Sequence, residues 1–70
     1  MVVYDRLWEY LKRFQVSQYR LMVSGISHST ITRLKRNQAV STETLGKICR
    51  ILECRLEDIA EYVPDKEKQL

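Results

Sequence analysis

The sequence predicts an all-α fold of five short helices. Apolar residues recur at the three- and four-residue spacing of an amphipathic helix in successive segments, serines stand where helices would begin, and no segment alternates apolar and polar residues convincingly. With 70 residues, 44% of them hydrophobic and 30% charged, the chain has the size and composition of one globular domain around a single core. We expect this domain to span residues 1–63 and residues 64–70 to form a charged C-terminal tail.

The first predicted helix lies in "VVYDRLWEYLKRF". At about 100° per residue, its apolar side chains fall within one arc and its charged side chains lie on the other side. The apolar arc consists of Val3, Tyr4, Leu7, Leu11 and Phe14, and the charged face of Asp5, Glu9, Lys12 and Arg13. Trp8 and Tyr10 flank the arc, so we expect them to wall the core rather than to bind a ligand.

The second and third helices are separated by a very short turn. In "VSQYRLMVSGIS", Ser17 can accept hydrogen bonds from the first amides of a short helix, and Gly25 can take positive φ where that helix ends. Ser27 repeats the capping chemistry ahead of "HSTITRLKRN", which leaves only about residues 24–27 for the connection. Two helices joined this tightly are expected to cross steeply.

The fourth helix follows Ser41, another candidate cap, and carries a buried stripe at the spacing of a helical face. The stripe consists of Leu45, Ile48, Cys49 and Leu52. Gly46 inside this helix costs roughly 1 kcal/mol relative to Ala, so we expect a close packing contact there. In "RLEDIAEYV" a fifth short helix is predicted, which Pro64 ends. Its apolar face would consist of Leu56, Ile59, Ala60 and Val63.

Charge is distributed unevenly along the chain. Residues 1–40 hold seven Lys/Arg and two Asp/Glu, residues 41–70 hold five and seven, and no Asp or Glu occurs between Arg13 and Glu43. On the third helix, Ile31 and Leu34 point one way, while polar and basic side chains share the opposite face. That face consists of Ser29, Thr32, Arg33 and Arg36. An ordinary solvent-facing helix mixes acids with bases, so this acid-free face indicates a polyanionic partner.

The segment "VSQYRLMVSGISHSTITRLKRN" resembles the helix-turn-helix of the lambda-repressor and Cro-like class, also called the Xre family, in particular its small single-domain bacterial members. The resemblance covers roughly residues 4–63, with "ISHSTITRL" in the place of the recognition helix and "TETLGKICRILECRLEDIAEYVP" closing the domain. It implies a compact five-helix lambda-repressor-like domain in which helices 2 and 3 form the helix-turn-helix. It also implies a sequence-specific transcriptional regulator, such as a repressor, that inserts helix 3 (about residues 28–36) into the major groove of double-stranded DNA.

The resemblance assigns roles to individual residues. Gln18 takes the place of a glutamine that hydrogen-bonds a DNA phosphate, and early residues of the recognition helix read bases. The base-reading positions correspond to His28, Ser29 and Arg33, with Thr32 beside them. From Leu21 to Ile31 the chain is one residue shorter than the usual spacing of the family, which requires a tightened turn or an early end of helix 2.

The chemistry of DNA is consistent with these roles. The major groove admits an α-helix and presents guanine O6 and N7, which an arginine grips with two hydrogen bonds, and Arg33 is the best placed for this. Ser27 lies at the amide end of helix 3, which favours an anion. Phosphate contacts are expected from the residues that close the helix and begin the loop. These residues are Lys35, Arg36, Asn37 and Gln38.

A different class of function is a protein-interaction module or antitoxin-like protein on the same fold, for which Trp8, Tyr10 and Tyr62 would be the surface. An enzyme is not expected, because the sequence suggests no nucleophile with its base and orienting group. Cys49 and Cys54 are interpreted as reduced, small apolar residues, and neither a metal nor a cofactor nor a small-molecule substrate is indicated. No apolar run reaches the roughly 20 residues that span a bilayer, so we expect a cytoplasmic protein. Because one recognition helix reads few base pairs, we also expect a homodimer on DNA.

Overall fold

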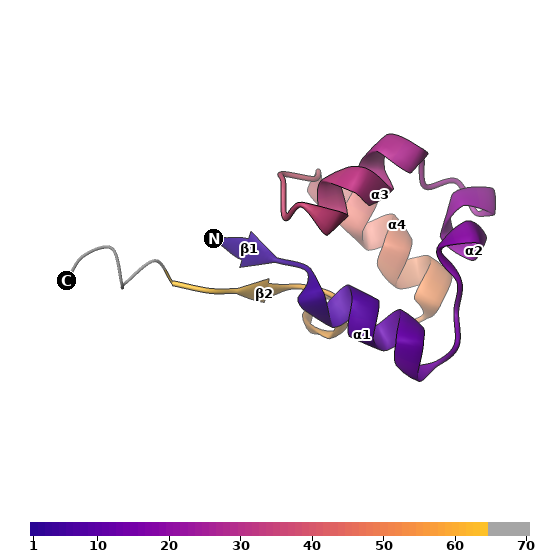
Figure 1. Ribbon diagram of the computed structural model, residues 1–70, viewed down its shortest axis with the longest axis horizontal. Helices are drawn as coiled ribbons and strands as arrows, with labels where there is room; N and C mark the ends of the chain where they lie inside the picture. The colour runs from indigo at the N-terminus through magenta and orange to yellow at the C-terminus, as the bar shows by residue number, and fades with distance from the viewer. Residues whose placement is uncertain (65–70) are drawn as a thin grey trace.

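The computed structural model describes residues 1–64 and contains four α-helices, one 3₁₀ turn and two very short strands (Figure 1). The helices are α1 (Asp5–Arg13), α2 (Gln18–Val23), α3 (His28–Lys35) and α4 (Thr42–Leu52), the 3₁₀ turn is η1 (Leu56–Asp58), and the strands are β1 (Val2–Val3) and β2 (Glu61–Tyr62). The predicted helix-turn-helix of the second and third helices is confirmed. The predicted charged tail, apart from Pro64, lies outside the described residues.

The predictions of a fifth helix and of a domain without strands are wrong. After the single turn of η1 the chain extends and pairs antiparallel with the N-terminal strand, in the register Val2 to Tyr62 and Val3 to Glu61. Figure 1 shows the two strands side by side, projecting from the helices. A short segment gains little from helix nucleation, whereas strand pairing with β1 satisfies its backbone groups directly. Its apolar spacing does not follow a buried helical face, because Ile59 is fully buried while Leu56 is 53% exposed.

Two residues assigned to the first helical arc also lie elsewhere. Val3 belongs to β1, and α1 begins only at Asp5. Phe14, just after the end of α1, is 55% exposed and packs against Tyr10 with the rings tilted by 44° and 4.6 Å between their centroids. The remaining members of the arc, Tyr4, Leu7 and Leu11, are buried as predicted.

One apolar core is shared by all four helices and by the segment after η1. Its buried residues are Tyr4, Leu7, Leu11, Leu21, Ile26, Ile31, Leu34, Leu45, Ile48, Leu52 and Ile59. The predicted inward residues of α3 and the predicted stripe of α4 are therefore confirmed, with Cys49 half-buried at the edge of the core. The predicted close contact at Gly46 is wrong, because a Cβ there would meet no atom within 4 Å.

Three of the helices begin at a serine cap, as predicted. The Oγ atoms of Ser17, Ser27 and Ser41 accept hydrogen bonds from the amides of Arg20, Thr30 and Thr44, at 3.2, 3.2 and 3.1 Å. Each bond satisfies an amide that has no partner within its own helix.

All four helices end in the same backbone arrangement. An amide two or three residues past the end of the helix donates to a carbonyl five residues earlier, in the pairs Val16 to Leu11, Ile26 to Leu21, Gln38 to Arg33 and Cys54 to Cys49, at 2.9, 3.0, 2.9 and 3.0 Å. This is a Schellman motif, and it requires a residue of positive φ just before the donor. Those residues are Gln15, Gly25, Asn37 and Glu53, so only one of the four is glycine. Within residues 1–64, no helix is long and apolar enough to cross a membrane.

We expect Ile48→Ala to lower the free energy of unfolding by about 2 to 5 kcal/mol, because it removes a fully buried side chain from the centre of a small core. Cys49→Ala is the matched control and should cost less, since Cys49 is only half-buried. Urea denaturation followed by circular dichroism measures both variants. An unchanged midpoint for Ile48→Ala would mean that this side chain does not anchor α4.

We expect Glu53→Gly to raise the free energy of unfolding by about 1 kcal/mol, because Glu53 has φ 54° and ψ 49°, a conformation that costs an L-residue roughly 1 to 2 kcal/mol. Glu53→Ala keeps the Cβ and serves as the control for loss of the carboxylate. Equal denaturation midpoints for the glycine and alanine variants would contradict a strained turn at this position.

Candidate nucleic-acid interface

The turn between α2 and α3 is fixed from inside and from the backbone. Ile26, in the middle of the connection, is only 2% exposed, and its amide donates to the carbonyl of Leu21 at 3.0 Å. Gly25 adopts φ 112°, which allows the chain to reverse in the four residues between Val23 and His28. The chain between Leu21 and Ile31 is one residue shorter than the family spacing expected from the sequence. The short connection is possible because α2 has only six residues and ends directly in a Schellman motif. The two helices lie next to each other at the upper right of Figure 1.

The outward face of α3 is polar, basic and without acids. Ile31 and Leu34 are buried, while the predicted contact residues His28, Ser29, Arg33, Lys35 and Arg36 are exposed and Thr32 is half-buried. Thr32 donates its hydroxyl proton to the carbonyl of His28 at 3.2 Å, so its oxygen remains an acceptor. Within residues 1–64, the ion pairs are Arg6 with Glu61 and Arg55 with Glu57, at 3.3 and 3.9 Å, and neither involves α3. The cations of α3 therefore remain available for an anionic partner.

A cluster of hydroxyl groups lies at the amino end of α3. The Oγ of Ser27 lies 3.1 Å from Oγ of Ser29 and 3.0 Å from Oγ1 of Thr30, in addition to capping the helix. Ser27 and Ser29 are exposed. The hydroxyls are thus held beside the first amides of α3, where the helix dipole favours negative charge.

Gln18, the residue predicted to bind a phosphate, is the first residue of α2 and is exposed directly after the Ser17 cap. At the other end of α3, Gln38 is exposed, but Asn37 is half-buried. Oδ1 of Asn37 accepts a hydrogen bond from the amide of Tyr4 at 2.9 Å, which ties the end of α3 to the start of α1. The structure therefore gives Asn37 a role within the fold that the sequence reasoning missed. An asparagine just past a helix is a signal for the positive φ that Asn37 adopts, but it does not indicate the bond to Tyr4.

Lys47 on α4 is a second residue that the sequence reasoning missed. Its Nζ donates to the carbonyl of Gly25 at 3.2 Å, across 22 residues of sequence. No local pattern in the sequence indicates this contact, because it depends on how α4 packs against the turn.

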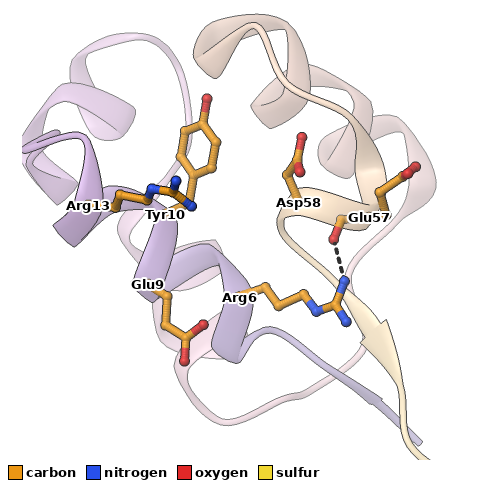
Figure 2. A pocket seen from close by; sticks show the side chains of 6 residues that line it. All are labelled: Arg6, Glu9, Tyr10, Arg13, Glu57 and Asp58. Carbon is orange, nitrogen blue, oxygen red and sulfur yellow. Dashed lines mark hydrogen bonds between the residues drawn. The ribbon is translucent and has the colours of Figure 1, made fainter.

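A separate open hollow lies between α1 and η1 (Figure 2). It is lined by Arg6, Glu9, Tyr10, Arg13, Glu57 and Asp58. Nη1 of Arg6 donates to the carbonyl of Glu57 at 2.9 Å and the guanidinium also pairs with Glu61, while the Tyr10 hydroxyl donates to the carbonyl of Leu52 at 3.2 Å. These bonds tie α1 to the C-terminal part of the domain. They give this hollow a structural role.

Two titrating groups near this hollow are shifted toward their neutral forms. Burial raises the pKa of the Tyr10 hydroxyl, and the nearby Cys54, Asp58 and Glu53 raise it further. Burial, followed by contact and a hydrogen bond with Cys49 and by the charge of Asp58, raises the pKa of the Cys54 thiol to about 11. Cys49 and Cys54 are free thiols. Because its pKa is raised, the Cys54 thiol stays protonated and poorly nucleophilic at neutral pH.

Comparison with known proteins extends over nearly the whole domain. The family described as "Cro/C1-type HTH DNA-binding domain" matches residues 6–65. The crystal structure of the transcriptional regulator VanUg, Form II, superposes with a TM-score of 0.83 at 34% sequence identity, covering 91% of this chain and 87% of that chain. Among curated proteins, none matches this chain.

Proposed function

Because the chain belongs to the Cro/C1-type helix-turn-helix DNA-binding family, we propose that it is a sequence-specific transcriptional regulator that inserts α3 into the major groove of double-stranded DNA. The observation that carries this proposal is the outward face of α3, which presents hydroxyls and unpaired cations while Ile31 and Leu34 fix the opposite side in the core. The outward face of α3 can therefore enter a groove of the duplex while its inner side stays packed in the core. The similarity to a solved transcriptional regulator supports the same role.

Base reading is assigned to the first part of α3. Arg33 is exposed, lies on the outward face and can donate two hydrogen bonds to guanine O6 and N7. His28 and Ser29 lie at the amino end of the helix, and Thr32 lies beside Arg33 with an acceptor oxygen available. This arrangement offers both donors and acceptors to base edges.

Phosphate contacts are assigned to the two ends of the helix pair. Gln18 and Ser27 stand at the amino ends of α2 and α3, and helix amino ends favour an anion such as a phosphate. Lys35, Arg36 and Gln38 stand at the carboxyl end of α3 and in the loop after it. Asn37 is the weakest of the proposed contacts, because its side-chain oxygen already binds Tyr4. Contacts at both ends would fix the angle of α3 in the groove.

The decisive experiment is selection of bound sites from random duplex DNA with the purified protein. An enriched sequence motif is the expected result. Negligible affinity for any duplex at low salt would instead favour a protein-interaction module or antitoxin-like protein on the same fold.

We further propose that the protein binds DNA as a homodimer, with half-sites about 34 Å apart on one face of the duplex. The surface proposed for the second copy is an apolar groove beside β2. It is lined by Val2, Leu45, Leu56, Glu57, Ala60, Glu61 and Tyr62. Val2, Leu56 and Tyr62 are 43%, 53% and 67% exposed, so three large side chains offer apolar surface along this groove.

Arg33→Ala should weaken binding to the selected site by roughly 1 to 3 kcal/mol and relax the preference at one base pair, because it removes a two-bond contact to a base. Arg36→Ala should weaken all sequences alike and reduce the salt dependence by about one phosphate contact. Affinities measured on the selected site and on its single-base variants, at several salt concentrations, separate the two. If Arg33→Ala kept the site preference while Ser29 or Thr32 variants changed it, α3 would sit in the groove with a different rotation.

Leu56→Asp should weaken binding to a duplex with two half-sites by about tenfold or more, while affinity for a single half-site is retained, because the charge enters the proposed dimer groove. Phe14→Asp is the control, since Phe14 is similarly exposed at 55% but does not line that groove. Sedimentation of the complexes gives their stoichiometry. Selected half-sites without a two-fold relation, or a full dimer in Leu56→Asp, would count against this surface.

A further inference from the structure

Lys47 holds the turn of the helix-turn-helix from outside it. The residue lies on α4, directly before the fully buried Ile48, and its Nζ donates to the carbonyl of Gly25 at 3.2 Å. That carbonyl belongs to the residue whose positive φ reverses the chain between α2 and α3. The contact therefore joins the point of reversal to a helix that the core holds in place.

The end of the Lys47 side chain lies close beside Gly25. A Cβ built on Gly25 would lie 2.9 Å from Cε and 2.5 Å from Nζ of Lys47, closer than non-bonded atoms approach. These atoms are the flexible end of the lysine, so a side chain at residue 25 would displace Lys47 from the turn. Glycine itself is favoured at this position by its φ of 112°.

The ammonium group of Lys47 interacts within the domain. No carboxylate among residues 1–64 forms an ion pair with Lys47, and the side chain is only partly exposed. The ammonium lies just past the C-cap of α2, Ser24, where the helix dipole favours a positive charge. A charged donor also forms a stronger hydrogen bond to a carbonyl than a neutral one does.

We propose that Lys47 is a positioning residue for DNA recognition. Its hydrogen bond to the Gly25 carbonyl holds the turn against α4 and so fixes the angle between α2 and α3. This inference rests on the proposed function, since it concerns how α3 is presented to the groove. Lys47 acts through the turn and does not itself contact DNA. Without the hydrogen bond from Lys47 to Gly25 the turn relaxes. The contacts of α3 with base edges, which need accurate placement, are then lost, while general attraction to phosphates persists.

The test compares Lys47→Met with Lys47→Arg and with the control Arg50→Met. Methionine keeps an unbranched apolar stem and good helix propensity but removes the charged donor. Arginine restores a charged donor at this position. Arg50 is exposed on the same helix, and its replacement removes a positive charge of α4 without touching the turn. Melting temperatures verify that all three variants fold.

We expect Lys47→Met to reduce the ratio of specific to non-specific DNA affinity by about tenfold, the loss of one charged hydrogen bond, with an unchanged slope of affinity against salt. Lys47→Arg should restore most of the ratio, and Arg50→Met should leave it near the wild-type value. Hydrogen exchange at the Ile26 amide, which closes the turn, should be faster in Lys47→Met alone.

Two results would overturn the inference. If Lys47→Met left both the ratio of specific to non-specific affinity and the hydrogen exchange at the Ile26 amide unchanged, the hydrogen bond from Lys47 to Gly25 would be dispensable. A uniform loss on all sequences with a salt slope smaller by about 0.9 would make Lys47 a phosphate contact instead. Failure of the wild-type chain to bind any duplex would overturn the proposed function, and exchange at Ile26 would then still decide whether Lys47 holds the turn.

Discussion

The hydrogen bonds that close the ends of its short helices are the constraint on which this domain depends. Its helices contain only six to eleven residues, well below the roughly 12 to 15 at which an isolated helix becomes even marginally stable in water. Serine caps at three starts and Schellman turns at all four ends satisfy many of the backbone groups that such short helices would leave unpaired. The price is a left-handed conformation at Gln15, Asn37 and Glu53, where no glycine relieves the strain.

These closures also determine how the interface is presented. Ile31 and Leu34 are the buried residues of α3, and its exposed face is available to a partner. Cations on that surface form no ion pair within the described residues, whereas Glu57 and Glu61, in the segment from η1 to β2, pair with Arg55 and Arg6. An approaching polyanion would therefore be attracted to the α3 surface, where no carboxylate pairs with the cations.

Local chemistry explains which parts of the structure the sequence could predict. Ser17, Ser27, Ser41 and Gly25 act within a few residues of themselves, so their caps and turn are visible as short patterns, and the buried stripe of α4 follows from its own periodicity. The segment after Leu56 was misassigned because its conformation is decided by β1, about 60 residues earlier in the chain. The bonds from Asn37 to Tyr4 and from Lys47 to Gly25 were missed for the same reason, since each joins residues that only the folded core brings together. On the proposed interface, the residue types and the face of α3 were predictable, but the hydrogen bond of Asn37 with the amide of Tyr4 was not.

The N-terminal strand connects the proposed DNA-binding face with the proposed dimer groove. Tyr4, which follows β1, binds Asn37 at the end of α3, and the strand itself pairs with β2 beside the groove. Two adjoining hollows, one running along the loop after α3 and the other along β2, share Val2 and Leu45 in their walls. A second copy seated against β2 would therefore also contact Val2 of β1, two residues before the Tyr4 amide that binds the end of α3. In such a dimer, the distance between the two recognition helices, and so between the half-sites, would be set by how the two copies pack at this groove.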